Sequence, residues 1–456
     1  MDTKKLRQKI LDLAIHGKLV PQDPNDEPAS VLLERIRAEK ERLVKEGKIK
    51  KSKATTTSDT PHYENVPFEV PSSWEWTTVE NICSKIGSGS TPKGSNYASE
   101  GIFFFRSQNV YNDGVVLEDI KYISEEVHQS MIGTEVLPND LLLNITGGSL
   151  GRCAIVPNEI DRGNVSQHVC ILRPIIVNAE YLHIFILSSF FAKTMKITGS
   201  GREGLPKYNL EKMLLPIPPI EEQTRIIHEL NKWNDWVIAI DNNQQDLVET
   251  IKQTKSKILD LAIHGKLVPQ DENDEPASEL LKRINPAAEI TCDNGQYGKE
   301  AFELPNTWVC CRLGDVISIK SGDSISVRNN RKGEYPIYGG NGINGYFCDY
   351  NVESDTIVIG RVGFYCGSVY KTKSKAWVTD NAFIVCYKNI FNSTYLKYVL
   401  EWLQLSKTSN STAQPVISGK GIYPLLIPLP PLTEQQRIVY AIDTTFAKLD
   451  AIMESL

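Results

Sequence analysis

Apolar residues recur in the middle of the chain at an alternating spacing of four and three positions. This seam begins after Glu221 and has two polar members, Gln244 and Thr254; its apolar members are Ile226, Leu230, Trp233, Val237, Ile240, Leu247, Ile251, Ile258 and Leu261. Such a heptad pattern is typical of a helix that packs lengthwise against a partner helix. About 41 residues at a rise of 1.5 Å per residue give a rod of roughly 60 Å. The pattern therefore predicts a long helix that can hold two domains apart.

The same series of segments occurs twice along the chain. The sequence ILDLAIHGKLVPQD at residues 10–23 recurs unchanged at residues 258–271, and PIPPIEEQTRII at residues 216–227 corresponds to PLPPLTEQQRIV at residues 428–439. Each half therefore consists of a helix, a variable globular region, a proline-rich entry and a further helix. Weaker matches keep the same order, PSSW at 71–74 with PNTW at 305–308, and VSQHVCIL at 165–172 with VTDNAFIV at 378–385.

The two ends of the chain continue the helical pattern. The repeats place the C-terminal and N-terminal segments on the same seam, so that together they rebuild the central helix. We therefore expect a pseudo-twofold, circular arrangement of two half-units. The alternative, a solenoid with its repeats in line, needs about three or more repeats of 20 to 50 residues and fits two long halves less well. The seam positions at the ends are Ile438, Ile442, Thr445, Leu449, Ile452 and Leu456, and Thr3, Leu6, Ile10 and Leu13.

Glycines and prolines mark the ends of the predicted helices. Gly17 and Gly265 stand where a residue in the left-handed conformation would end a helix. His16 and His264 precede them, and because neither has a partner at metal-ligand spacing, we assign both a structural role at the helix end. A proline stands near the first turn of the next helix in each half, at Pro28 and Pro276.

Length and composition indicate a globular protein of two or three domains. The chain has 456 residues, 41% hydrophobic and 23% charged, and a domain averages ~150 residues. The N-terminal segment carries charges among its apolar residues and so does not resemble a signal peptide. The most apolar stretch, residues 181–192, is shorter than the ~20 residues that span a bilayer. We expect a cytoplasmic protein that makes no contact with a membrane.

The nine cysteines indicate neither a disulfide framework nor a zinc site. No CxxC pair is present, and only Cys310 and Cys311 are neighbours. We expect the cysteines to be reduced and mostly buried.

Sequence motifs of nucleotide and methyl-donor enzymes are missing. There is no GxxxxGK[ST] loop, and no Asn-Pro-Pro-aromatic run of the kind that amino-methyltransferases use. The glycine-rich runs GSGST at 87–91 and TGGSLG at 146–151 precede no helix with an acidic ribose ligand, so we interpret them as tight turns or close approaches between strands. The seven histidines form no HExxH motif and no recognisable triad. We predict that the chain alone is not catalytic and binds no metal and no cofactor.

The proline-rich entries carry a resemblance to a known family. LPIPPIEEQTRII and IPLPPLTEQQRIV, each opening a long helix after a strand-rich region, resemble the entries to the two spacer helices of specificity subunits from type I restriction–modification systems. The segments YPIYGGNGINGY, TIVIGRVG and WVTDNAF in the second half are similar to one class of target-recognition domain in that family. The resemblance covers nearly the whole chain, and its doubled PxPP…EQ…RI pattern is specific. The prolines themselves we interpret as a rigid approach to the helix.

The resemblance implies an α+β fold of two strand-rich target-recognition domains, separated by two long antiparallel coiled-coil spacer helices. Each domain would read one half of a split DNA site, with half-sites roughly 10 bp apart on one face of the duplex. We divide the chain into an N-terminal helical segment and linker, a first recognition domain, a central spacer helix with the helical segment after it, a second recognition domain and a C-terminal spacer helix, at residues 1–60, 61–220, 221–285, 286–432 and 433–456.

The resemblance also implies partners. Members of the family bind double-stranded DNA and two modification subunits, which carry S-adenosylmethionine and methylate adenine. The complex can recruit restriction subunits, which use ATP and Mg²⁺. None of these cofactors is expected on this chain.

Net charge agrees with DNA binding in only one half. The whole chain carries −6, although phosphate contacts normally use clustered Lys and Arg. Residues 305–423 hold 13 Lys and Arg against 8 Asp and Glu, whereas residues 71–210 hold 11 against 14. The second region has the expected positive bias, and the first would need a local patch or phosphate contacts supplied by its partners.

Candidate base contacts in the second half are polar and basic residues next to turns. Arg, Lys, Asn, Gln, Ser and Thr carry the donors and acceptors that read base edges in the major groove. RNNRK precedes the YGGNG turn, and a further arginine stands between two strand-like runs. The candidates are Arg328, Asn329, Asn330, Arg331, Lys332, Asn341 and Arg361.

Candidates in the first half come from two short polar segments. RSQN follows the apolar run IFFF, and SQH takes the place that TDN has in the second half. The candidates are Arg106, Ser107, Gln108, Asn109, Ser166, Gln167 and His168. For each cluster the alternative is a solvated loop, and for Arg106 and Arg361 it is a structural ion pair.

Two other functions are compatible with the same sequence. A scaffold that binds proteins instead of DNA would show no salt-sensitive binding to duplex DNA. A self-sufficient DNA methyltransferase would bind S-adenosylmethionine as the lone chain.

Overall fold

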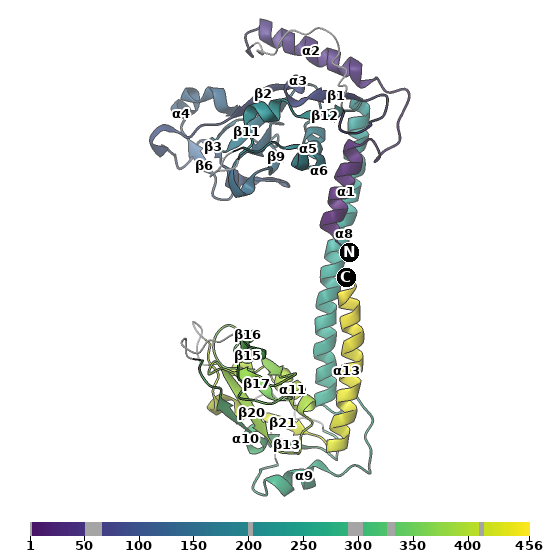
Figure 1. Cartoon of the computed structure of the whole chain (residues 1–456), viewed down its shortest axis with the longest axis vertical. Helices are drawn as coiled ribbons and strands as arrows, with labels where there is room; N and C mark the ends of the chain where they lie inside the picture. Colours follow the sequence, from purple (N-terminus) through teal and green to yellow (C-terminus); the bar gives the residue numbers. More distant parts are fainter. Residues whose placement is uncertain (1, 51–65, 199–203, 291–303, 326–332, 410–414) are drawn as a thin grey trace. The chain divides into compact units, whose positions relative to one another are not determined.

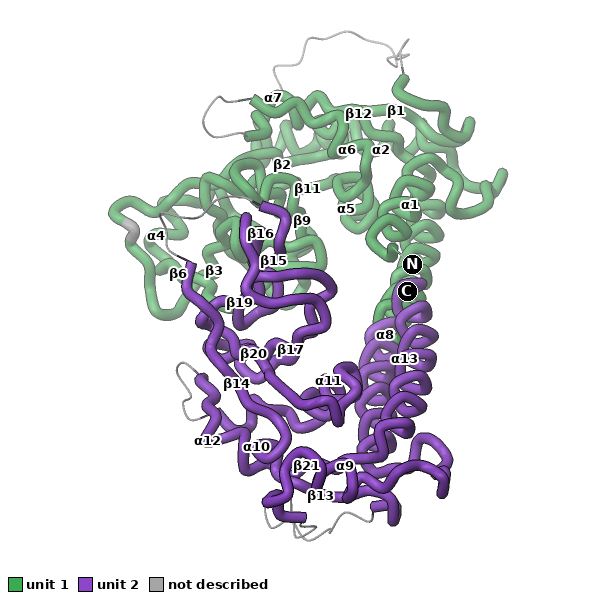
Figure 2. The backbone as a smooth tube through the Cα atoms, turned by 60° about the horizontal axis from the view of Figure 1, so that its bottom comes forward, with its two compact units in different colours: residues 1–243 green, residues 244–456 purple. Residues whose placement is uncertain are grey.

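The chain folds into two compact units, residues 1–243 and 244–456 (Figure 2). The computed structural model describes residues 2–50, 66–198, 204–290, 304–325, 333–409 and 415–456. Each unit contains both helices and strands, so the predicted mixed fold class is confirmed. Among the described residues, no helix combines the length and the apolar character needed to cross a membrane.

Helix ends follow the predicted glycines and prolines. In the first unit Gly17 follows the C-cap of α1 (Thr3–Ile15) with a left-handed φ of 65°, and the Lys18 amide closes the turn on the Leu13 carbonyl at 2.9 Å. Pro28 is the N-cap of α2 (Ala29–Lys45). In the second unit Gly265 has a φ of 66°, and Pro276 is the N-cap of α9 (Ala277–Ile284). His16 Nδ1 lies 2.5 Å from the Asp12 carbonyl oxygen and His264 Nδ1 lies 2.7 Å from that of Asp260, which supports the helix-end role.

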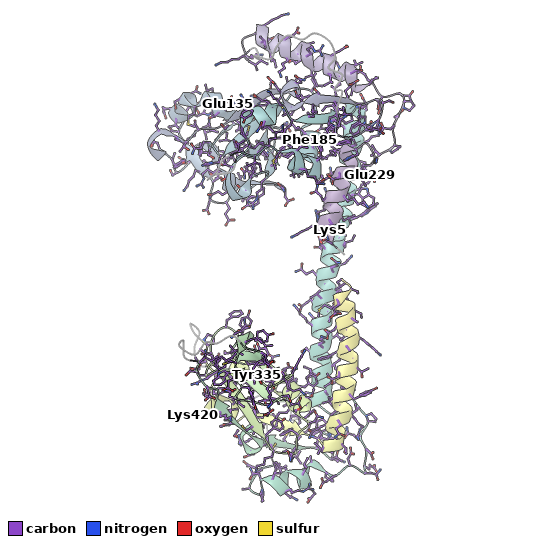
Figure 3. The ribbon with its side chains drawn as sticks, in the orientation of Figure 1. Lys5, Glu135, Phe185, Glu229, Tyr335 and Lys420 are labelled. Atoms are coloured by element: carbon purple, nitrogen blue, oxygen red, sulfur yellow. The ribbon has the colours of Figure 1, made fainter. Side chains whose placement is uncertain are left out.

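α8 is one continuous helix of 44 residues, Ile220–Ile263, and α13 is the helix Leu432–Glu454. Within the first unit α1 lies along the beginning of α8, where the Arg7 guanidinium is 3.2 Å from the Asp241 carboxylate (Figure 1). Within the second unit α13 lies along the rest of α8, where the Gln244 amide donates to the Leu456 carbonyl at 2.8 Å. Figure 3 shows Lys5 on α1 and Glu229 on α8.

The buried face of α8 departs from the predicted heptad after Gln244. Leu247 is 37% exposed, and the half-buried position is Val248. Likewise Thr254 is exposed, and Lys255 is half-buried beside α13. An α-helix drifts ~20° per heptad unless it supercoils, so a neighbouring residue comes to face the partner after a few turns. The assignment of Leu247 and Thr254 to the seam was therefore wrong. Buried or half-buried residues of α8 instead recur at a spacing of 11 positions, as in residues 237 and 248, 244 and 255, and 251 and 262.

The globular part of the first unit is built on two four-stranded sheets. Their strand orders are β6-β3-β10-β7 and β2-β11-β8-β9, and the pairs β1-β12 and β4-β5 complete the unit. The bounds are β1 Glu75–Thr78, β2 Cys83–Ser88, β3 Ile102–Phe105, β4 Val110–Tyr111, β5 Gly114–Val115, β6 Lys121–Ile123, β7 Glu135–Val136, β8 Leu141–Asn144, β9 Cys153–Ile155, β10 Gly163–Val165, β11 Val169–Pro174 and β12 Leu214–Ile217. Its short helices are α3 Val79–Ile82, α4 Glu125–Ser130, α5 Ala179–Leu187, α6 Ser189–Thr194 and α7 Lys207–Glu211.

The globular part of the second unit has sheets of four and three strands. Their orders are β14-β20-β17-β18 and β16-β15-β19, with β13 paired to β21. The bounds are β13 Val309–Arg312, β14 Ile317–Ser321, β15 Tyr335–Gly339, β16 Gly342–Phe347, β17 Ile357–Gly360, β18 Val369–Lys371, β19 Trp377–Val378, β20 Ala382–Tyr387 and β21 Leu426–Leu429. The helices are α10 Leu313–Val316, α11 Ser393–Trp402 and α12 Gly419–Ile422.

Each unit has a core between its sheets and helices. In the first unit the buried side chains include Phe185 of α5, which is labelled in Figure 3, and Tyr181, whose hydroxyl donates to the Pro216 carbonyl at 2.8 Å. In the second unit Tyr395 of α11 donates to the Pro428 carbonyl at 3.3 Å. The proline-rich strands β12 and β21 are thus held against a helix, which supports their structural interpretation. Among the described cysteines six are buried, and Cys348 and Cys386 are exposed.

A buried carboxylate joins each globular part to the helix that follows it. The Glu222 side chain accepts from the Trp74 indole nitrogen at 2.9 Å and from the Gln22 amide at 2.7 Å. Burial raises the pKa of Glu222, which is fully enclosed. The second unit repeats the arrangement, with Trp308 at 2.9 Å and Gln270 at 2.7 Å around Glu434.

Candidate nucleic-acid interface

Four loops meet at the strand ends of the first unit. The Ser166 amide donates to the Phe105 carbonyl at 2.9 Å, which ties the loop after β10 to the loop after β3. The Asn144 amide side chain donates to the Ser107 carbonyl at 2.9 Å, so the end of β8 joins them. The Ser90 amide, after β2, donates to the Val165 carbonyl at 3.1 Å. These strand-end loops contain residues 88–91, 106–109, 145–152 and 166–168.

The second unit brings together strand ends in the same way. The Thr379 amide donates to the Tyr338 carbonyl at 2.9 Å, next to the parallel pairing of β15 with β19. The Arg361 amide, after β17, donates to the Asn381 carbonyl at 2.9 Å. The Asp323 amide, after β14, donates to the Val378 carbonyl at 2.9 Å. The strand-end loops of this unit contain residues 322–325, 340–341, 361–368 and 379–381.

Glycines permit these loops to pack closely. A β-carbon on Gly89 would lie 1.7 Å from the Val165 carbonyl oxygen, and one on Gly322 would lie 2.3 Å from that of Val378. Gly147, in the second glycine-rich run, has a φ of 75°. The interpretation of both runs as a close approach and a tight turn is confirmed.

The loop after β3, residues 106–109, contains both exposed and buried candidates. Arg106 is half-buried; its guanidinium Nη2 donates to the Asp119 carbonyl at 2.8 Å, and its Nε has no hydrogen-bond partner. Gln108 is exposed and Ser107 is half-buried. Asn109 is fully buried, and its side chain donates to the Val116 carbonyl at 3.0 Å while accepting from the Arg106 amide at 3.1 Å. Its selection as a base contact does not agree with the structure, because both ends of the amide are used to hold the loop.

The residues of the SQH segment, 166–168, also differ in their exposure to solvent. Gln167 is exposed, and His168 is half-buried with its Nδ1 2.8 Å from the Thr146 hydroxyl. Ser166 is 6% exposed, and its hydroxyl has no hydrogen-bond partner.

Two candidates of the second unit lie in neighbouring loops. Asn341 is exposed at the turn between β15 and β16. Arg361 is half-buried; its guanidinium lies 5.2 Å from the centre of the Phe383 ring and 3.4 Å from the Ser321 hydroxyl. Within the described residues neither Arg106 nor Arg361 pairs with a carboxylate, because Arg106 donates to a backbone carbonyl and Arg361 lies beside a hydroxyl and a ring. The RNNRK candidates, Arg328, Asn329, Asn330, Arg331 and Lys332, lie outside the described residues.

Unpartnered polar atoms concentrate at the strand ends. In the described part of the chain, eight buried side-chain nitrogen or oxygen atoms have no hydrogen-bond partner, and five of them are in or beside these loops. Buried polar atoms are nearly always satisfied, so a group of exceptions requires an explanation. The five are Arg106 Nε, Asn144 Oδ1 and Ser166 Oγ in the first unit, and Arg361 Nε and Thr379 Oγ1 in the second.

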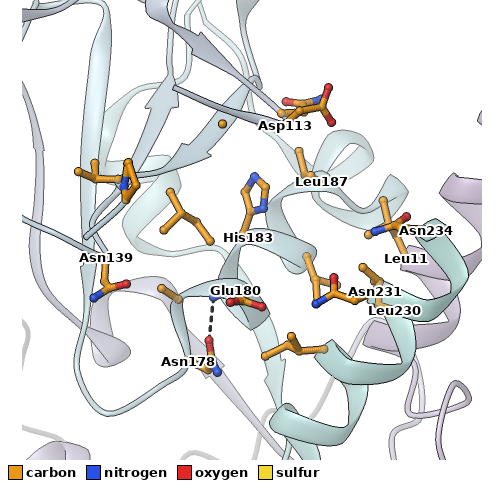
Figure 4. A pocket seen from close by; sticks show the side chains of 18 of the residues that line it. Leu11, Asp113, Asn139, Asn178, Glu180, His183, Leu187, Leu230, Asn231 and Asn234 are labelled. Atoms are coloured by element: carbon orange, nitrogen blue, oxygen red, sulfur yellow. Dashed lines mark hydrogen bonds between the residues drawn. The ribbon is translucent and has the colours of Figure 1, made fainter. Parts of the chain in front are cut away.

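A separate groove of about 1100 Å³ lies in the first unit between α5 and the helices α1 and α8 (Figure 4). His183 lies at its wall, where its Nε2 donates to the Cys153 carbonyl at 2.8 Å, and burial lowers the pKa of the imidazole. The groove is lined by both acidic and basic side chains, and by none of the first unit's candidate residues. The groove is therefore not part of the candidate interface. The charged residues that line it are Asp113, Asp140, Glu159, Glu180, Lys4, Arg7 and Arg173.

The comparison that decides the family covers both globular regions. A family model described as the type I restriction modification DNA specificity domain matches residues 71–250 and 305–456. The chain belongs to this family of specificity subunits. It is a DNA-recognition component of a restriction–modification system and not itself an enzyme.

Curated relatives of the specificity subunit extend over its whole length. The EcoAI specificity subunit of Escherichia coli is 31% identical, over 96% of this chain and 88% of that protein. The EcoEI specificity subunit of the same organism is 29% identical, over 99% of this chain and 90% of that protein.

Solved structures show the same fold. A chain from a study of complex assembly and conformational transition of the type I restriction–modification system has a TM-score of 0.58, with 18% identity over 85% of this chain and 94% of that one. The HsdS subunit from Thermoanaerobacter tengcongensis has a TM-score of 0.52, with 18% identity over 85% of this chain and 93% of that one.

The specificity subunit has two strand-end residues that the sequence candidates omitted. Asn144 ends the buried strand LLLN, where a polar residue after three apolar ones is a usable signal. Thr379 matches Ser166 in the alignment of VTDN with VSQH, and that correspondence alone could have selected it.

Proposed function

We propose that each unit reads one half of a bipartite DNA target with its strand-end loops. The unpartnered polar atoms carry this proposal, because they occur at corresponding strand ends of both units. A buried donor or acceptor without a partner lowers stability, and a DNA base or phosphate offers the missing hydrogen bond. The exposed Gln108, Gln167 and Asn341 add side chains of the type that reads base edges.

We further propose that the two units are pseudo-twofold copies joined by spacer helices. The matched clusters around Glu222 and Glu434, and the parallel pairs β3–β10 and β15–β19, support a repeated unit. The pairing of α1 and then α13 with a single helix, α8, supports a two-helix, antiparallel coiled-coil spacer. Under this proposal the spacer sets the gap between the half-sites.

The partners belong to the proposal as well. We infer that the chain assembles with two modification subunits and with restriction subunits, as a component of a type I system. S-adenosylmethionine would then be bound by the modification subunits, and ATP with Mg²⁺ by the restriction subunits. The complex would act on DNA in the cytoplasm.

Reconstitution with the cognate modification subunits tests the proposal. Co-expression in a host without adenine methylation, followed by sequencing of modified bases, should show methylation at one bipartite sequence. The purified chain alone should methylate nothing. Methylation by the lone chain, or the same methylated sequence when the chain is omitted, would contradict the proposed role.

A further inference from the structure

The turn between β17 and β18 displays an aromatic side chain to solvent. Phe364 is 89% exposed, the highest exposure among the large hydrophobic side chains in the described residues. Its neighbour Tyr365 is 47% exposed, and the two rings are in edge contact at 5.1 Å. Nothing in the described part of the molecule covers the Phe364 ring.

Backbone hydrogen bonds hold this turn in place. The Gly363 amide donates to the Pro415 carbonyl at 2.9 Å, and the Ile417 amide donates to the Arg361 carbonyl at 3.1 Å. The Cys366 amide closes the turn on the Gly363 carbonyl at 2.9 Å, and the Cys366 side chain is buried. Phe364 therefore lies on a turn whose conformation is held by backbone hydrogen bonds.

The first unit contains the same turn without the aromatic residue. Residues 145–152 and 361–368 both connect two antiparallel strands and make the same four backbone hydrogen bonds, which include Leu150 to Gly147 and Cys366 to Gly363. The pairs Gly147 with Gly363 and Gly151 with Gly367 have positive φ in both turns. Counted along the turn, Phe364 stands where the first unit has Gly148. The backbone of the turn thus forms without an aromatic side chain, and Phe364 is not needed to fold it.

The turn lies among the candidate DNA contacts. Arg361 begins it, and its Nε is one of the unpartnered atoms. The turn that carries Asn341 packs against it, because a β-carbon on Gly340 would lie 2.7 Å from the Val362 carbonyl oxygen. The polar candidates for DNA contact and the exposed Phe364 ring therefore lie in the same cluster of loops.

We propose that Phe364 makes an apolar contact with a base in the half-site read by the second unit. This inference rests on the proposed function and adds a specificity-determining residue to it. Phenylalanine contacts DNA bases in two ways, against the methyl group of thymine or as a wedge inserted between base steps. Either contact covers a ring that is otherwise in water.

The test uses the complex of this chain with its modification subunits. Phe364→Ala should weaken binding to the cognate duplex by about tenfold, which is the usual scale of one base contact. Binding to unrelated DNA should not change, and Phe364→Leu should retain part of the affinity. Tyr440→Ala is the matched control, because Tyr440 is 75% exposed on α13 and lies outside the strand-end loops. Methylation by the wild-type complex separately establishes the proposed function.

Modified DNA then distinguishes the two contacts. If Phe364 meets a thymine methyl group, deoxyuridine at one thymidine of the second half-site should lower wild-type binding and leave the Phe364→Ala complex unchanged. If the ring is a wedge, 2-aminopurine at the contacted step should become fluorescent with the wild type only. Cognate binding by Phe364→Ala equal to wild type would overturn the proposal. So would a loss of affinity that neither modified DNA reproduces.

Discussion

Neighbouring residues of one loop have separate roles, as Gln108 and Asn109 show. Both are amides in a polar segment after a strand, and composition does not distinguish them. The buried Asn109 side chain hydrogen-bonds three backbone groups, whereas Gln108 is exposed to solvent. Sequence reasoning selected Arg106, Ser166 and Arg361, and each of them has a buried side-chain atom without a hydrogen-bond partner. It could not detect the burial of Asn109, because that depends on how the loop returns on itself.

This difference predicts that alanine substitutions at the two positions affect different properties, stability at Asn109 and DNA binding at Gln108. Asn109→Ala should lower the free energy of unfolding by about 1–3 kcal/mol, because it leaves buried backbone groups unpaired. Gln108→Ala should leave the free energy of unfolding unchanged and weaken binding to cognate DNA. Urea unfolding followed by circular dichroism, with DNA binding on the same preparations, checks both. Equal stability of the two variants would show that Asn109 does not hold the loop.

The ion pair between Asp274 and Arg437 gives a pH-dependent prediction. The guanidinium lies 2.7 Å from the nearly buried carboxylate and holds the pKa of Asp274 below its usual value of 3.8. A depressed pKa in the folded state stabilises the protein above the pKa of the unfolded state, and the gain is lost as pH falls through the lower value. Asp274→Asn should therefore cost about 1.5–3 kcal/mol at neutral pH. The difference from wild type should shrink below about pH 4.

Thermal unfolding over a pH series measures this difference, with Glu272→Gln as the control at an exposed neighbouring position. If the difference in thermal stability between wild type and Asp274→Asn stays constant down to the most acid pH at which both fold, the ion pair is not its cause.

At the scale of elements, the helix ends were predictable and the strand pairing was not. Gly17 and Gly265 mark helix ends because a left-handed residue is a local requirement. The parallel pairing of β3 with β10 joins residues 102–105 to residues 163–165, and no local pattern specifies so distant a partner. The heptad analysis located α8 and placed Leu247 on the wrong face, because a small angular drift accumulates over many turns.

Insertions into α8 should separate the gap between half-sites from the choice of bases. Asn242 lies between Asp241, which pairs with α1, and Gln244, which pairs with α13. Seven residues inserted after Asn242 lengthen the helix by ~10 Å and turn it by only ~20°. The methylated half-sites should remain the same and the gap between them should grow by about three base pairs at 3.4 Å each.

A two-residue insertion at the same position is the control, because it turns the rest of the helix by ~200°. Each unit should still fold, as thermal unfolding would show, and methylation of the bipartite site should be lost. Methylation with the original gap by the seven-residue variant would show that α8 does not set the spacing.

At the scale of the whole molecule, two separate cores predict separable half-sites. The two buried clusters of the first unit share no residue with the two of the second. Exchange of residues 305–423 for the equivalent region of a related specificity subunit should therefore change one half of the methylated sequence and preserve the other. Sequencing of modified bases in a host that expresses the chimaera gives the result. A change in both halves would mean that the units do not read DNA independently.

The paired turns at residues 145–152 and 361–368 also bear on how such a protein diversifies. The four hydrogen bonds that close each turn come from the main chain, so the exposed positions at the tips, Gly148 and Phe364, are not needed for the turns to form. Gly148 in one turn and Phe364 in the other illustrate how far those positions can differ while the scaffold stays the same. Under the proposed function, new target sequences would arise by substitutions at the tips of the turns while the subunit stays folded. For the same reason, a library randomised at the tips of these two turns should yield mostly well-folded subunits with altered DNA preference.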